Sequence, residues 1–210
     1  RYANGISLLA SYTLAKAQDY NSDNDGTVTV ANVYDIAGYN YGPADYDIRH
    51  TVSVAGAYEL PLGRTKWYGG WQVSGIGYWR TGYPFTPGQT GTILSTTPGG
   101  TGQRPNVVGN WEIDDPSVDK WFEPTAFQPP ADNTGTWGDA GRNIMRGPEQ
   151  FNIDMSLIKN TRFGRFNLEL RCEAFNVLNH PQFGQPNRTI GNAAVATIPG
   201  MLTNPACSTC

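Results

Sequence analysis

Three ionisable side chains alternate along one short segment of the chain, at Glu169, Arg171 and Glu173. Residues two apart in an extended strand project from the same face, so these side chains can form ion pairs along one side of it. Such a row could line a transport path through the protein, or it could be a network of ion pairs that stabilises the protein wall around such a path. We favour the wall network, because neighbours at this spacing commonly pair with each other and across strands.

A second group of polar residues resembles a metal-binding loop. Residues 21–26, Asn-Ser-Asp-Asn-Asp-Gly, match the first half of a calcium loop, in which oxygen ligands alternate and a glycine permits a sharp turn. The twelfth position is Asn32 rather than glutamate, and no helical pattern flanks the loop. The sequence therefore favours a solvated loop over a calcium site.

The histidines and cysteines are poorly spaced for a metal site. His50 and His180 have no cysteine or carboxylate at ligand spacing. Cys207 and Cys210 form a single CxxC at the C-terminus, where a four-ligand site would need two further ligands, and Cys172 is isolated. We predict no metal site, no disulfide framework and no cofactor.

Catalytic constellations are equally weak. Asp114, Asp115 and Asp119 could suggest paired carboxylates, but they lie in a polar stretch where solvated side chains are the better explanation. No serine sits in a GxSxG turn, and no glycine-rich phosphate loop follows a strand and opens a helix. We predict that the chain is not an enzyme.

The composition limits the class of protein that could position these residues. The 210 residues include 15 Lys and Arg and 18 Asp and Glu, a net charge of −3, which gives no reason to expect nucleic acid as a partner. Gly and Pro are abundant, at 25 and 15 residues, which argues against a helical bundle. No apolar window of about 18 residues exists, which excludes a membrane-spanning helix, but a membrane strand needs only ~10 alternating residues.

Five segments alternate between apolar and polar residues with a period of two, as strands do. In the clearest example, Phe166, Leu168 and Leu170 alternate with Asn167 and Glu169. One face of these segments avoids charge and the other tolerates it, although a soluble antiparallel sheet shows the same alternation. The predicted strands cover residues 5–17, 51–60, 70–81, 151–160 and 166–175.

The connections between these segments alternate strictly between short and long. Residues 61–68 and 161–165 are short enough for hairpins, whereas residues 18–50, residues 82–150 and the chain after Val177 are long. In an up-and-down meander all short turns fall at one end, which is the geometry of outer-membrane barrels. We therefore predict an all-β fold: an antiparallel meander that forms part of a transmembrane β-barrel with long extracellular loops, in which Glu169, Arg171 and Glu173 face the lumen.

Several blocks of sequence resemble a known family. In order, they are Ser11–Ala17, Asp47–His50, Gly70–Ile76, Thr81–Phe85, Trp121–Phe127, Gly141–Pro148 and Arg171–Pro181. Their order resembles the late barrel strands of TonB-dependent outer-membrane receptors, of the type with a carboxypeptidase-regulatory-like domain at the N-terminus. The resemblance covers roughly residues 5–195, so the whole chain, residues 1–210, is identified as the C-terminal part of such a barrel.

The resemblance implies both a function and partners. It implies a barrel of about 22 strands, plugged by an N-terminal domain, that takes up a scarce nutrient of the siderophore, oligosaccharide or peptide class. The implied partners are outer-membrane lipid, the rest of the barrel, the plug domain and the TonB energising system, which acts through an N-terminal part that this chain lacks. The implied location is the bacterial outer membrane.

The two ends of the chain depart from a complete receptor. Arg1 is not a start methionine, and residues 191–210 show no alternating strand and no terminal aromatic residue, so we expect a piece of a larger protein with an altered or missing closing strand. One alternative remains, a soluble β-rich carbohydrate-binding module in which Trp111, Trp121 and Trp137 stack on sugar rings.

Overall fold

The structure is a computed structural model that describes residues 5–22, 31–32, 34–62, 68–89, 103–130 and 136–202. The chain divides into two compact units, each assembled from three stretches of sequence. The strand unit contains residues 1–14, 49–81 and 150–181, and the loop unit contains residues 15–48, 82–149 and 182–210.

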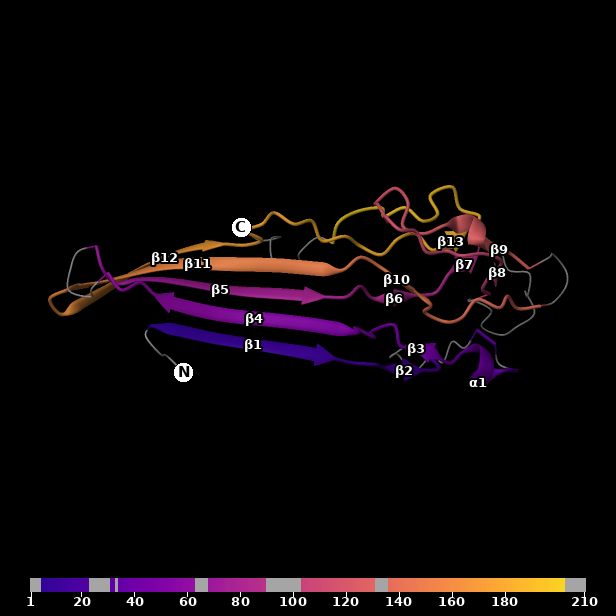
Figure 1. Cartoon of the computed structure of the whole chain (residues 1–210), viewed down its shortest axis with the longest axis horizontal. Helices are drawn as coiled ribbons and strands as arrows, with labels where there is room; N and C mark the ends of the chain where they lie inside the picture. The colour runs from indigo at the N-terminus through magenta and orange to yellow at the C-terminus, as the bar shows by residue number, and fades with distance from the viewer. Residues whose placement is uncertain are drawn as a thin grey trace. The chain divides into compact units, whose positions relative to one another are not determined.

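The strand unit is one antiparallel sheet of five long strands that follow one another in chain order (Figure 1). This arrangement confirms the predicted meander, and all five predicted segments are strands. Their bounds are β1 (Ile6–Leu14), β4 (His50–Glu59), β5 (Trp71–Arg80), β11 (Gln150–Phe163) and β12 (Phe166–Ala174).

Two strand ends differ from the prediction by three residues, and the other bounds agree to within one residue. β1 stops at Leu14 rather than at residue 17, because the Ala17 N–H donates to a side chain, Oδ1 of Asp47 at 2.7 Å, instead of to a neighbouring strand. β11 runs on to Phe163, which pairs with Phe166 across a two-residue turn. Gly164 has φ +57° there, a conformation that glycine adopts without strain.

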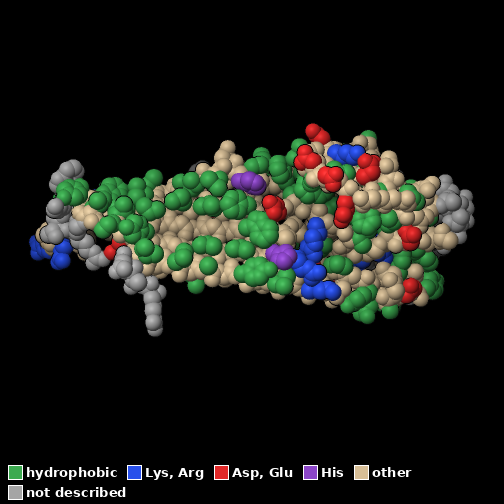
Figure 2. Space-filling model, in the orientation of Figure 1, with side chains coloured by type: hydrophobic (Ala, Val, Ile, Leu, Met, Phe, Trp, Pro, Cys, Tyr) green, Lys and Arg blue, Asp and Glu red, His purple; other side chains and the backbone are tan. Residues whose placement is uncertain are grey.

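The register places the apolar positions of all five strands on one face of the sheet. Leu8 lies opposite Gly56, Val54 opposite Gly77, and Gly77 in turn opposite Ile153. Figure 2 shows mainly hydrophobic side chains over these strands. Many of them are exposed, including Leu8 at 69%, so no layer formed by the described residues of this unit packs against the apolar face.

Lys159 also lies on the apolar face, where it is opposite Trp71 and Leu170. Its Nζ donates to the carbonyl oxygen of Gly69 at 2.7 Å and lies 4.8 Å from the centroid of the Trp71 ring. The charge is therefore held at the end of the sheet, beside the short connections, while the alkyl stem can cover apolar surface.

The loop unit is built from short elements. Its described residues form one helix, α1 (Ile36–Tyr39), a 3-10 turn η1 (Pro124–Ala126), and four two-stranded pairings. The paired strands are β2 (Gln18–Asp19) with β3 (Gly42–Pro43), β6 (Pro84–Phe85) with β10 (Met145–Arg146), β7 (Gly88–Gln89) with β13 (Thr189–Ile190), and β8 (Asn106–Val107) with β9 (Phe127–Gln128).

These long connections share a hydrophobic core of their own. Phe85, Phe122, Phe127, Met145 and Ile190 are buried together although they come from four separate segments. The sequence predicted long loops here but no common core. Among the described residues, no helix is long and apolar enough to cross a membrane.

Candidate functional site

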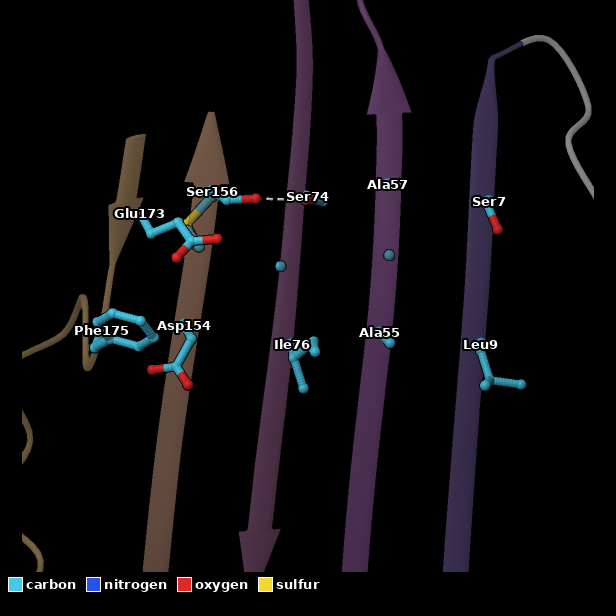
Figure 3. Close-up of a pocket in the computed structure, with 13 residues that line it drawn as sticks. Ser7, Leu9, Ala55, Ala57, Ser74, Ile76, Asp154, Ser156, Glu173 and Phe175 are labelled. Carbon is cyan, nitrogen blue, oxygen red and sulfur yellow. Dashed lines mark hydrogen bonds between the residues drawn. The ribbon is translucent and has the colours of Figure 1, made fainter. Parts of the chain in front are cut away.

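The polar face of the sheet carries a groove of about 520 Å³, which we call the sheet groove (Figure 3). Small side chains such as Ala55, Ala57 and Ser74 face it from the middle strands, and the larger apolar side chains of Leu9, Ile76 and Phe175 also line it. Figure 3 shows Leu9 on the β1 side, and Asp154 and Glu173 on the side of β11 and β12. Hydroxyl groups join neighbouring strands across this face, with Ser74 and Ser156 at 2.6 Å.

Asp154 in the sheet groove anchors the segment that follows β12. Its Oδ1 accepts from Nδ2 of Asn152 and from the backbone N–H of Asn176, both at 2.8 Å. Asn176 has φ +49° and its side chain accepts from the His180 N–H and donates to the His180 carbonyl. The block at residues 171–181 therefore contains a side-chain-stabilised turn, for which an asparagine tolerates the left-handed conformation.

The predicted ion network is present on β12. Arg171 Nη2 lies 3.0 Å from Glu169 Oε1, and Arg171 Nη1 lies 3.5 Å from Glu173 Oε1. The residues opposite this row on β11 are Ser156, Ile158 and Asn160, so these ion pairs run along the strand rather than across it. All three side chains are about half exposed. The prediction that they line a lumen stays a prediction.

Two blocks that lie about a hundred residues apart in the sequence meet in the loop unit. The Asp47 carboxylate, whose residue is 2% exposed, accepts from Arg146 Nη2 at 2.5 Å and from the Ala17 N–H. Arg146 Nη1 donates to the Asp47 carbonyl oxygen at 2.9 Å and to the Gly82 carbonyl oxygen at 3.2 Å. Arg146 thus holds together three of the sequence blocks quoted above, those at 47–50, 81–85 and 141–148.

A close approach between two backbone segments explains why position 82, in the block at 81–85, is a glycine. A Cβ added to Gly82 would lie 1.9 Å from the carbonyl oxygen of Gly147, a distance that no side chain can occupy. The Gly147 N–H donates to the Tyr83 carbonyl oxygen at 2.9 Å beside it. The glycine is therefore required by packing between the two segments.

The first residues of the block at 141–148 bind the N-terminal part of the loop unit. Arg142 contacts Asp19, donates to Ser22 Oγ at 2.7 Å and lies 3.4 Å from Asp45 Oδ1. Asn143 Nδ2 donates to Asp45 Oδ1 at 2.5 Å. Sequence reasoning missed these contacts, although the acids Asp19 and Asp45 near the early blocks and Arg142 in the later block were the available signal.

The remaining residues with metal-binding chemistry are dispersed. His50 Nδ1 lies 2.8 Å from the Tyr12 hydroxyl, and His180 packs edge-on against Phe151. Cys172 is exposed on β12. Within the described ranges, no three His, Cys, Asp or Glu side chains are grouped to hold a metal ion.

Two sequence features lie partly or wholly outside the described residues. Cys207 and Cys210 are outside them, as are residues 23–26 of the calcium-like loop. Of the rest of that loop, Asn32 is buried and its Oδ1 accepts from the N–H groups of Tyr34 and Asp35. Asp114, Asp115 and Asp119 are exposed, as expected for solvated carboxylates.

The three tryptophans that suggested sugar stacking pack within their own unit. Trp111 lies against Phe127 with ring centroids 5.8 Å apart, and Trp121 donates from Nε1 to the Arg146 carbonyl oxygen at 2.8 Å. Trp137 donates from Nε1 to the Ala31 carbonyl oxygen and meets Tyr39 edge-on. Their rings and N–H groups therefore help to hold the loop unit together.

Comparison with known families decides the class of the protein. The family described as "Outer membrane beta barrel domain" matches residues 1–205, nearly the whole chain. The chain belongs to this outer-membrane β-barrel family. No curated protein and no solved structure matches the chain. The family membership agrees with the antiparallel meander and places the protein in the outer membrane, so the soluble sugar-binding module is set aside.

Proposed function

We propose that the chain is a wall and loop segment of a TonB-dependent transporter that takes up a scarce nutrient of the siderophore, oligosaccharide or peptide class. The observation that carries the proposal is the meeting of the receptor-like blocks around Arg146, which pairs with Asp47 and binds the Gly82 carbonyl oxygen. Three of the blocks that resemble one family in order along the sequence, those at 47–50, 81–85 and 141–148, are therefore joined by direct contacts.

In this proposal the apolar face of the sheet contacts outer-membrane lipid. Leu8, Val54 and Leu168 lie on that face and are 69%, 39% and 47% exposed, which would be unfavourable in water but suits hydrocarbon. Trp71 and Lys159 at the short-connection end, with the neighbouring Phe163 and Phe166, match the aromatic and basic residues of a membrane boundary.

The polar face would then look into the barrel. The sheet groove and the row of Glu169, Arg171 and Glu173 would meet the plug domain or the water around it. In this role the chain performs no chemistry of its own and binds no cofactor. It encloses the lumen, displays the loop unit to ligands, and depends on the plug and the TonB system for transport.

Two measurements on the whole protein that carries this chain test the proposal. Reconstituted in a planar lipid bilayer, a plugged transporter stays closed to KCl, whereas an open pore conducts steadily. A plugged receptor also binds the purified periplasmic domain of the inner-membrane energising protein. Steady conductance together with no binding of that domain would contradict transport of this type and would indicate a porin.

A further inference from the structure

The loop unit contains a second cavity, of about 490 Å³, which is a typical volume for a small-molecule site. We call it the arginine cavity, because three arginines line it from three separate segments. Polar groups dominate its wall. The lining residues that the argument uses are Asp45, Gln89, Arg104, Arg142 and Arg188.

The wall of the arginine cavity carries more positive than negative charge. Arg104, Arg142 and Arg188 line it, against one carboxylate, Asp45. Arg142 is already paired with Asp19 and with Asp45. Arg188 is exposed, and within the described residues its guanidinium has no ion-pair partner. A negative group in the cavity would therefore meet an excess of guanidinium charge.

Two residues of the wall have buried polar side-chain atoms that find no hydrogen-bond partner within the described part of the chain. These atoms are Nε2 and Oε1 of Gln89 and Nε of Arg104. Buried polar groups are nearly always satisfied, so atoms of this kind mark a place where a partner is missing. Gln89 can both donate to and accept from a ligand, which favours hydroxyl or amide groups.

Arg104 is held rigidly and is 3% exposed. Its guanidinium carbon lies 3.6 Å above the centroid of the Tyr39 ring, and Nη2 donates to the Tyr39 carbonyl oxygen. Burial lowers the pKa of Arg104, contacts with Tyr39 oppose that shift, and the nearby charge of Arg142 adds to it. An anion placed between these guanidinium groups would offset both the burial and the mutual repulsion.

We propose that the arginine cavity binds a small organic anion, with its carboxylate or phosphate group near Arg104 and Arg188 and its hydroxyl or amide groups on Gln89. The inference rests on the proposed function, because it takes the bound anion to be the transported nutrient. It narrows that nutrient to an acidic, hydroxylated molecule. The binding itself needs neither the plug's energising partner nor transport.

The test compares matched sugars on the whole protein in detergent. D-glucuronate and D-glucose differ by a carboxylate in place of a hydroxymethyl group, and glucose 6-phosphate offers a phosphate instead. We expect at least one of the two anions to bind at least tenfold more tightly than glucose in calorimetric titration at low salt, and the stronger of them identifies the preferred group. Equal binding of all three, or no binding, overturns the inference.

Substitutions locate the binding. Arg188→Gln removes an exposed charge and should weaken the preferred anion at least fivefold with thermal unfolding unchanged, and Gln89→Leu should weaken all three sugars. Lys120→Gln, outside the cavity, is the control and should leave every affinity unchanged. The assignment of binding to the arginine cavity is overturned if the protein still prefers the anion over glucose after Arg188→Gln. It is also overturned if Lys120→Gln reduces that preference as much as Arg188→Gln does. Binding without dependence of uptake on the energising protein would contradict the proposed function and leave the cavity assignment intact.

Discussion

The carboxylate of Asp47 is almost fully buried and depends on Arg146 for its compensation. Arg146→Met would remove the guanidinium that pairs with this buried carboxylate, and removing one member of a buried pair is strongly destabilising. Because the Arg146 side chain is 34% exposed, we expect a loss of roughly 2–4 kcal/mol in the free energy of unfolding. Urea unfolding followed by tryptophan fluorescence measures it, since Trp121 donates to the Arg146 carbonyl oxygen.

The matched control is the exposed pair between Lys120 and Glu123, with side chains 51% and 31% exposed. Lys120→Met should cost less than about 1 kcal/mol, because solvent screens such pairs. Equal losses for Lys120→Met and Arg146→Met would show that Asp47 is not held by Arg146 in the way described.

Glu123 provides a pH-dependent prediction. Hydrogen bonds from Lys120 first, and then from the side chain and backbone of Thr125, lower the pKa of Glu123 from 4.5 to about 2. A lowered folded-state pKa means that the contribution to stability is present above pH 4.5 and is lost as the pH falls from 4.5 toward 2. NMR titration of the carboxyl carbon should give a pKa below 4.5 that rises in Lys120→Met. An unshifted pKa in both proteins would refute the contact.

At the scale of the strand, Leu8 and Leu9 offer an internal comparison. They are the same residue type, 69% and 71% exposed, but Leu8 is on the apolar face and Leu9 lines the sheet groove. Leu8→Arg should cost about 2–4 kcal/mol in the intact barrel, less if the site is near the membrane boundary. Leu9→Arg should be milder, because the groove also contains Asp154 and Glu173. Urea unfolding in lipid vesicles compares the two, and equal losses would mean that the apolar face does not meet lipid.

The long strands were predictable from sequence because alternation is a local signal. Residues 166–175 were expected as a strand and form β12 over Phe166–Ala174, with Glu169, Arg171 and Glu173 on one face as expected. The end of β1 was not predictable, since it depends on Asp47, more than thirty residues away. The core of Phe85, Phe122 and Phe127 was also missed. Phe85 and Phe127 lie in two-residue strands and Phe122 lies in no strand, so their segments have no periodicity to detect.

The arginine cavity lay beyond sequence reasoning as well. Gln89, Arg104 and Arg188 are unremarkable in the sequence, and only the folding of separate segments of the loop unit brings them to one cavity. The receptor-like blocks, in contrast, are identified by their resemblance in sequence alone, without their contacts. Arg146 then supplied the physical reason that distant blocks belong together.

At the scale of the whole molecule, β1 and β12 are the edge strands of the five-stranded sheet, and neither pairs with a further strand in the part of the chain that the structure describes. Unpaired edges and an exposed apolar face favour association in water. Expressed alone in detergent-free buffer, residues 1–210 should aggregate, and detergent should be needed to keep them dispersed. A monodisperse, cooperatively unfolding monomer without detergent, seen by light scattering and thermal denaturation, would argue against a membrane wall.

The membrane-wall assignment itself is tested most directly by spin-label accessibility in lipid bilayers. In the whole protein, with Cys172, Cys207 and Cys210 replaced by serine, single labels are placed at the adjacent pairs Leu8 and Leu9, and Val54 and Ala55. Oxygen, which concentrates in hydrocarbon, should relax the labels at Leu8 and Val54 more than those at Leu9 and Ala55. A water-soluble nickel chelate should not relax the labels at Leu8 and Val54 more than those at Leu9 and Ala55. Equal accessibility of both members of each pair to the nickel chelate would contradict a sheet with one face in lipid.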